Sequence, residues 1–298
     1  MAGISVVINT LNQAKDLKRA INSVKWADEI LICNMGSDNE TVKIAGEIGA
    51  RVISHKKLEH VEPARNFAIS NAKNDWILII DPDEEVSENL RNRLVQIASK
   101  MEQIDYVRIP RKNLIFDKWM KASMWWPDYN VRFFKKGKVK WNDKIHRPPE
   151  VIGQGLDLPA EEKWSIIHYH YGNIPQFLER MNRYTGVQAN ELNKEGYKFD
   201  WRDLIKKPLG EFLGRFFASR GYQDGIHGLA LSLLQAFSQL FLYLKLWEME
   251  KFKQVEINLS DLNVVSKQAG KEIDYWFKNV GLSQNPFKRF VQKVKSKI

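Results

Sequence analysis

Short apolar runs alternate with amphipathic segments over the first hundred residues. Runs rich in isoleucine and valine predict strands, whereas apolar residues that recur every three or four positions predict helices. The predicted strands are residues 4–8, 29–33, 51–54 and 76–80, and the predicted helices between them are residues 13–24, 41–48 and 63–72. Apolar strands separated by helices are typical of a parallel sheet covered on both faces. We therefore expect an α/β domain with its ligand at the carboxyl ends of the strands.

The pattern changes twice further along the chain. Strand-like pieces at 106–110, 130–134 and 166–169 are separated by loops rich in tryptophan and lysine, and predicted helices follow at 175–194, 204–220 and 226–251. In the last segment, residues 286–298, apolar side chains share one helical face and lysines occupy the remainder. These changes divide the chain into two predicted regions. Residues 1–173 form the first, with two halves that meet near residue 100, and residues 174–298 form a helical region that ends in a basic amphipathic tail.

Charge is the compositional feature that bears on function. The 298 residues include 46 lysines and arginines against 36 acids, a net charge of +10. Such a balance favours anionic partners: phosphorylated substrates, nucleic acid or an acidic membrane surface. No nucleic-acid motif accompanies the charge, so we expect no nucleic-acid partner.

Compartment is indicated by three observations. The one cysteine, Cys33, excludes a disulfide within the chain, which suits a reducing compartment. The first residues lack the charged start of a signal peptide. Polar residues interrupt the longest apolar region, 228–247, so we expect no transmembrane helix. A cytoplasmic protein is the resulting expectation.

An acidic motif follows the last apolar strand directly. Asp81-Pro82-Asp83-Glu84-Glu85 would lie at the carboxyl edge of the sheet. Two acids separated by one residue can share a hard divalent cation, Mg²⁺ or Mn²⁺, and so join it to a diphosphate. The alternative is an acidic turn that begins the next helix, because Glu84 and Glu85 suit a helix N-terminus. The motif alone does not decide between them.

Several segments, taken in order, resemble inverting family 2 glycosyltransferases. They are ISVVINTLN, WADEILICNMGSDNETVKIAGEIGARV, EPARNFAISNAKNDWILIIDPDEEV, RKNLIFDKWM, WWPDYNVRFFKKG, IHYHYGN and GYQDGIHGLALSLLQAF. The resemblance weakens after about Trp247 and is closest to the bacterial branch that includes lipopolysaccharide core β-glucosyltransferases. It implies a GT-A fold, a Rossmann-like, mostly parallel sheet flanked by helices with a helical C-terminal extension. Residues 1–173 would then be the catalytic domain, with the nucleotide sugar held by the first hundred.

The resemblance also assigns a donor site and a metal site. The nucleotide-sugar residues it implies are Thr10, Asn12, Asn34, Ser37, Asp38, Arg65, Asn66 and Asp81. Asp81 and Asp83 match the acids of the family's D-x-D motif. Arg65 matches a position near the phosphates, which a guanidinium binds bidentately. The third metal ligand implied is His168, with His170 in reserve. Without the resemblance, a surface helix arginine is an equally good interpretation of Arg65, and packing or surface residues are the alternative for the two histidines.

Two departures from the family pattern affect the predicted nucleotide site and the predicted general base. Asn34 and Asn39 stand where the family usually has aspartates. An asparagine can accept the N3–H of uracil but can also donate, so the nucleotide base is not fixed, and Asn34 also suits a simple turn. In the His-Glu pair expected to hold the general base, arginine follows His146 instead of glutamate. The candidate bases are Glu150, His146, Asp128 and Asp143, with Glu150 preferred. The alternative for Glu150 is an exposed loop acid.

The resemblance thus implies a metal-assisted, inverting hexosyl transfer from a nucleotide-diphosphate sugar to a hydroxyl of a cell-envelope glycan or lipid-linked acceptor. The basic tail predicts peripheral binding to the anionic inner face of the plasma membrane. For the apolar face of residues 226–247, docking on the catalytic domain, entry into the membrane interface and a homodimer contact stay open. A non-catalytic relative that binds nucleotide sugar or glycan, and a polyprenyl-phosphate sugar transferase, are the alternative functions.

Overall fold

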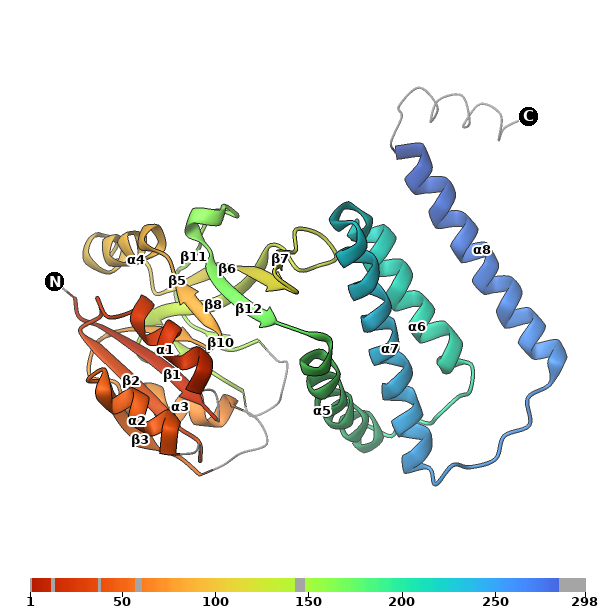
Figure 1. Ribbon diagram of the computed structural model, residues 1–298, viewed down its shortest axis with the longest axis horizontal. Coiled ribbons are helices and arrows are strands. Elements are labelled where there is room, and N and C mark those ends of the chain that lie inside the picture. The colour runs from red at the N-terminus through yellow and green to blue at the C-terminus, as the bar shows by residue number, and fades with distance from the viewer. Residues whose placement is uncertain (1, 12–13, 37–38, 57–60, 143–147, 284–298) are drawn as a thin grey trace. The chain divides into compact units, whose positions relative to one another are not determined.

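The chain forms two compact units in the computed structural model, which describes residues 2–11, 14–36, 39–56, 61–142 and 148–283 (Figure 1). The first unit comprises Met1–Ile115 and Trp126–His170, and the second comprises Phe116–Trp125 and Tyr171–Ile298.

A mixed sheet is the centre of the first unit. Four strands in it are parallel: β1 (Ile4–Thr10) lies between β2 (Glu29–Asn34) and β4 (Trp76–Ile80), and β3 (Arg51–Ser54) borders β2. Beyond β4 the sheet continues with β8 (Asp128–Lys135), β6 (Tyr106–Ile115), β12 (Ile166–Tyr171) and β5 (Glu84–Val86). Shorter strands are β7 (Lys118–Trp119), β9 (Val139–Lys140), β10 (Glu150–Val151) and β11 (Gly155–Asp157).

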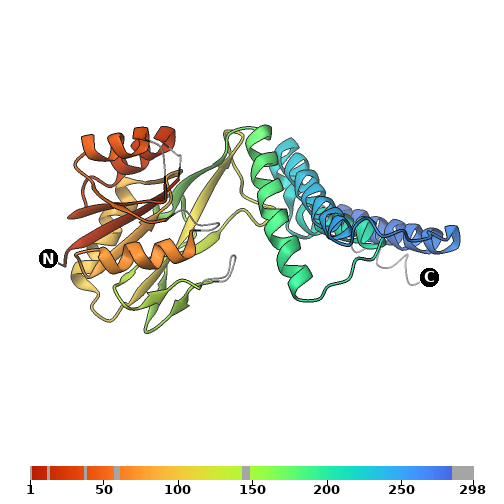
Figure 2. The same ribbon diagram turned by 90° about the horizontal axis from the view of Figure 1, so that it is seen from below.

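Helices cover both faces of this sheet, as its uninterrupted apolar strands require (Figure 2). On one face, α1 (Ala14–Ser23), α2 (Asn39–Glu47) and α4 (Glu88–Lys100) pack against the alternate side chains Val6, Ile8, Leu78 and Ile80. On the other face, α3 (Glu62–Asn71) packs against Val7, Leu31, Ile77 and Ile79. The predicted fold class, a mostly parallel sheet flanked by helices and followed by a helical region, is confirmed.

The acidic motif does not begin a helix. Glu84 and Glu85 lie in the short strand β5, which pairs antiparallel with β12. The next helix, α4, starts after Ser87, whose hydroxyl accepts a hydrogen bond from the backbone N–H of Leu90 at 3.3 Å. Ser87 is therefore the N-cap, and the acids before it are left for another role.

The second unit is a set of helices. Its members are α5 (Ile174–Lys194), α6 (Asp203–Leu213), α7 (Ile226–Met249) and α8 (Leu259–Ser283). A π-helical turn, Gly214–Ala218, follows α6 and ends the helix that the sequence predicts to continue to residue 220. Gly228 of α7 lies so close to the carbonyl oxygen of Gly221 that a Cβ would stand 1.8 Å from it, which only glycine permits. One helix among the described residues, α7, is long enough and apolar enough to cross a membrane. The core helix of a soluble protein can meet the same criteria of length and composition.

Candidate active site

Asp81 is the first residue after β4, at the carboxyl edge of the parallel strands. The loop that it begins is closed by two hydrogen bonds. The N–H of Asp81 donates to the Glu84 carboxylate at 2.8 Å, and the N–H of Glu84 donates to the Asp81 carbonyl at 2.9 Å. Because β5 follows at once and pairs with β12, this turn holds Asp81 and Asp83 in fixed positions.

Two arginines neutralise Asp81. Arg65 Nη2 of α3 lies 2.5 Å from one carboxylate oxygen of Asp81, and Arg132 Nη2 of β8 lies 2.7 Å from the other. Arg132 also lies 2.7 Å from Glu84, whose side chain is completely buried. Burial alone would raise the pKa of Asp81 and lower that of Arg132. Their mutual attraction, with help from Arg65, outweighs burial, so the pKa of Asp81 lies well below and that of Arg132 well above its ordinary value.

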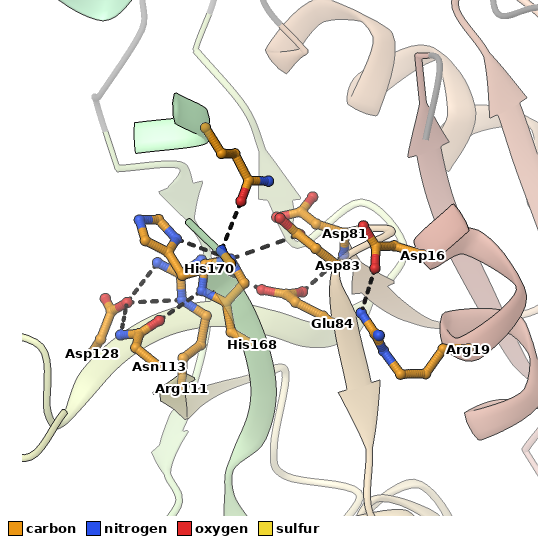
Figure 3. Close-up of polar contacts among 12 residues, drawn as sticks. Asp16, Arg19, Asp81, Asp83, Glu84, Arg111, Asn113, Asp128, His168 and His170 are labelled. Carbon is orange, nitrogen blue, oxygen red and sulfur yellow. Dashed lines mark hydrogen bonds and ion pairs between the residues drawn. The ribbon is translucent and has the colours of Figure 1, made fainter. Parts of the chain in front are cut away.

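Asp83 and His168 face each other beside this cluster (Figure 3). His168 Nε2 lies 3.7 Å from Asp83 Oδ1, and both residues are buried. The strand register explains the approach. His168 of β12 stands opposite Glu84 of β5, and the next residue, Tyr169, donates its N–H to the Asp83 carbonyl at 2.9 Å. The structure thus brings together three of the predicted residues, Asp81, Asp83 and His168, at one edge of the sheet.

A second group of polar side chains contacts His168 on the side of Nδ1, the ring nitrogen that does not face Asp83. His168 Nδ1 lies 2.6 Å from Asn113 Oδ1, and Asn113 Nδ2 lies 3.2 Å from Asp128 Oδ2. Arg111 donates to the same Asp128 oxygen at 2.6 and 2.9 Å and contacts Glu84 at 3.4 Å. His170 Nδ1 lies 3.2 Å from His168 Nε2. Figure 3 shows these side chains grouped around His168.

Asp83 and His168 fit a divalent cation by their chemistry. They offer one carboxylate oxygen and one imidazole nitrogen, which Mn²⁺ accepts, whereas Mg²⁺ uses one or two carboxylates with water and substrate phosphates. Within the described part of the chain, no group of three or more histidines, cysteines or acids is arranged to hold a metal by itself. A metal here would therefore need phosphate oxygens or water to complete its coordination.

The remaining donor-site predictions fall in different surroundings. Thr10 and Asn34 are register partners at the ends of β1 and β2. Asn34 Oδ1 accepts from the N–H of Gly36 at 3.1 Å, so it does form the turn that its sequence also allowed. Asn66 uses both ends of its amide on the backbone of Trp141, at 2.8 and 2.9 Å, which anchors the loop after β9. Asn12, Ser37 and Asp38 lie outside the described residues.

The candidate bases are also unlike one another. Glu150 is exposed at the start of β10, which pairs with β9. Asp128 is bound by Arg111, Asn113 and Asn130. Burial alone would raise the pKa of Asp128, but the charge of Arg111 and these hydrogen bonds lower it below the ordinary value. A carboxylate held in this way is a weak base. His146 and Asp143 lie outside the described residues.

Comparison with known proteins places the chain in a family. The family model described as glycosyl transferase family 2 matches residues 5–150. An uncharacterized glycosyltransferase of Rickettsia typhi is 32% identical over 258 residues, which cover 84% of this chain and 88% of that protein. One from Rickettsia bellii is 32% identical over 256 residues, 83% and 86% of the two chains. The chain belongs to glycosyl transferase family 2.

Solved structures similar to this glycosyltransferase match less of its length. Glucosyl-3-phosphoglycerate synthase from Mycobacterium tuberculosis, in complex with Mn²⁺ and UDP-glucose, is 24% identical with a TM-score of 0.34. That match covers 37% of the present chain and 44% of the synthase. Mannosyl-3-phosphoglycerate synthase from Rubrobacter xylanophilus is 16% identical with a TM-score of 0.40, over 65% and 75% of the two chains.

The sequence interpretation missed three buried residues of the glycosyltransferase's site. They are Arg132, Glu84 and Asn113. A signal for Arg132 was present, because a charged residue inside the apolar run VRFF is costly to bury without a partner. Asn113 is separated from Arg111 by one residue on a strand, so both point to one face. Nothing in the sequence, however, names Asp128 and His168 as their partners.

Proposed function

We propose that this glycosyltransferase transfers a hexosyl group, with inversion, from a nucleotide-diphosphate sugar to a hydroxyl of a cell-envelope glycan or lipid-linked acceptor. The observation that carries the proposal is the Asp83–His168 pair, 3.7 Å apart and adjacent to Asp81 and Arg65 at the carboxyl edge of the sheet. Phosphate-binding and metal-binding groups are thereby concentrated where α/β proteins bind ligands.

Each residue has a distinct role in this proposal. Asp83 and His168 hold the divalent cation, which, when bound, neutralises charge on the departing diphosphate. Arg65, 13% exposed at its side chain, donates hydrogen bonds to the phosphate oxygens and stabilises the same charge. Asp81 holds Arg65 in place until the donor binds. A general base removes the proton of the acceptor hydroxyl as that oxygen attacks the anomeric carbon.

Glu150 is the base we propose, because it is exposed to an incoming acceptor whereas Asp128 is held by Arg111. Glu150→Gln is expected to lower kcat by about 10²- to 10⁴-fold with little change in the KM of the donor. The measurement is steady-state transfer, with the anomeric configuration of the product read by NMR as the check on inversion. Glu161→Gln, an exposed acid that pairs with Lys163, is the matched control and should keep wild-type turnover. Wild-type turnover by Glu150→Gln would assign the base elsewhere.

An apolar stripe on α7 supports a membrane-bound acceptor. Ile226, Leu233, Phe237 and Phe241 are 42 to 73% exposed, and their spacing places them on one face of the helix. The other faces of α7 pack against α5 and α6. An ordinary surface helix presents polar residues to water. The chain as a whole carries a net charge of +10, which favours an anionic surface. We propose that this stripe contacts an anionic bilayer from the cytoplasmic side.

Vesicle flotation tests the membrane contact. The Phe237→Gln/Phe241→Gln double variant is expected to bind phosphatidylglycerol vesicles at least tenfold more weakly, since each buried phenylalanine contributes about 1.5–3 kcal/mol. Ile152→Gln, which removes an exposed apolar side chain of the first unit, should bind like wild type. Undiminished binding by the double variant would contradict the proposal. Self-association of wild type that the double variant loses, without vesicle binding, would make the stripe a subunit contact.

A further inference from the structure

A continuous chain of polar contacts leads from Arg111 to Nδ1 of His168, the ring nitrogen that does not face Asp83. Arg111 holds Asp128 at 2.6 Å, Asp128 contacts the amide nitrogen of Asn113 at 3.2 Å, and the amide oxygen of Asn113 contacts His168 Nδ1 at 2.6 Å. Asn113 is 1% exposed and His168 4% exposed, so water does not compete freely for these groups. The contacts join three neighbouring strands, β8, β6 and β12.

The direction of each hydrogen bond in this chain follows from the Asp128 carboxylate, which can only accept. Burial opposes the ionisation of Asp128, but Arg111 and its other donors lower its pKa, so at neutral pH the carboxylate has no proton to give. The Asn113 group that faces it must be the NH₂ end, and the carbonyl end must face His168. A carbonyl accepts only, so His168 Nδ1 carries the hydrogen. In a neutral imidazole the lone pair is then on Nε2.

The nitrogen with the lone pair is the one that faces Asp83. His168 Nε2 lies 3.7 Å from Asp83 Oδ1 and 3.2 Å from His170 Nδ1. Because Nε2 accepts, His170 must be the donor of that hydrogen bond, and a cation bound at Nε2 would replace it. An amide is suited to the position of Asn113 because it accepts with one end while it donates with the other.

We propose that Asn113 is a positioning residue that fixes the Nδ1–H tautomer of His168, so that Nε2 is ready to bind a divalent cation together with Asp83. This inference rests on the proposed function for the presence of the cation. Residues that accept the second ring N–H of a metal-binding histidine raise its basicity and hold its ring, and their loss costs about 10- to 100-fold in metal affinity.

The tautomer is measured directly by long-range ¹H–¹⁵N NMR of the full chain with ¹⁵N-labelled histidine, with His168 assigned by His168→Gln. In wild type, His168 Nδ1 is expected to show the shift of a protonated ring nitrogen and Nε2 that of an unprotonated one. In Asn113→Leu, which keeps the volume but removes both hydrogen bonds, the Nε2–H form is expected to become populated. A general loss of stability would not by itself change the tautomer.

Metal affinity is measured on the same proteins with Mn²⁺ alone, by the loss of the free-ion EPR signal. Asn113→Leu is expected to bind Mn²⁺ about 10- to 100-fold more weakly than wild type. The matched control is Asn130→Ala, which removes a 3.0 Å hydrogen bond to the other oxygen of Asp128 without contacting His168. Asn130→Ala should keep the Nδ1–H tautomer of His168. Its Mn²⁺ affinity should stay within about twofold of wild type, whereas loss of Asn113, the direct partner of His168, is expected to lower that affinity about 10- to 100-fold.

The outcomes separate the inference from the function on which it rests. An Nε2–H tautomer in wild type, or wild-type Mn²⁺ affinity in Asn113→Leu, would overturn the role of Asn113. Absence of Mn²⁺ binding by wild type would overturn the metal site, and with it the purpose proposed for the tautomer, although the NMR result would still stand. Asn113→Leu that does not fold leaves the wild-type NMR spectrum to decide.

Discussion

Asp83→Asn is expected to lower kcat/KM for sugar transfer by about a thousandfold, because a metal supplies several kcal/mol of charge stabilisation in the transition state and each 1.36 kcal/mol is tenfold in rate. Asparagine keeps the shape of the side chain but removes the negative charge that would hold the cation opposite His168, 3.7 Å away. The measurement is release of nucleoside diphosphate, together with sugar transfer to acceptor, at saturating Mn²⁺.

Glu85→Gln is the control for this experiment. Glu85 lies two residues further along the same segment, but its carboxylate accepts a hydrogen bond from the hydroxyl of Tyr169 at 2.9 Å instead of facing His168. The same carboxylate-to-amide change there is expected to leave the rate within about threefold, since a glutamine oxygen can still accept the hydrogen bond from Tyr169 and the side chain does not face His168. Equal rates for the Asp83→Asn and wild-type enzymes would exclude Asp83 as the metal ligand.

Arg132→Met is expected to lower the free energy of unfolding by about 3–5 kcal/mol, because it leaves the buried Glu84 carboxylate with only the longer, 3.4 Å contact to Arg111. Glu84 is completely buried and Arg132 is 3% exposed, so water cannot replace the lost guanidinium. Asp81 would keep Arg65 alone. The measurement is urea unfolding at equilibrium, monitored by tryptophan fluorescence with circular dichroism as the second probe.

Arg108→Met is the matched surface variant. Arg108 pairs with Asp157 at side-chain exposures of 49 and 45%, and loss of such a pair costs about 1 kcal/mol or less. If the two variants were equally stable, the cluster around Asp81 would not be a buried charge network. The double variant Arg132→Met/Glu84→Gln should recover part of the loss, because it removes the charge of Glu84, which would otherwise keep only the 3.4 Å contact with Arg111.

Much of the first unit could be predicted because its strands are buried on both faces. The strand Trp76–Ile80 has no polar position. Its uninterrupted apolar run therefore predicts where the strand begins and ends, and that it lies inside a parallel sheet. Once that place was known, Asp81 had to follow at the carboxyl edge. The predicted strands 51–54 and 76–80 agree with β3 and β4 at both ends.

The interior of the site could not be predicted, because antiparallel pairings over long separations create it. His168 reaches Asp83 through the pairing of β12 with β5, and Asn113 reaches Asp128 through the pairing of β6 with β8. A one-residue slip in either register would turn these side chains to the other face. Helix α8 lies inside the region 174–298 that the sequence predicts to be helical, but its bounds, Leu259–Ser283, were not predicted.

Titration calorimetry with nucleotide-diphosphate sugars, UDP-glucose first among a panel of uridine, guanosine and adenosine donors, tests the central claim most directly. With Mn²⁺ present, wild type should bind at least one donor with one site per chain, and both removal of Mn²⁺ by EDTA and the Asp83→Asn change should weaken that binding. Binding of a donor that neither treatment weakens would contradict a cation held by Asp83, and binding of no donor would contradict a nucleotide-sugar site at this edge of the sheet.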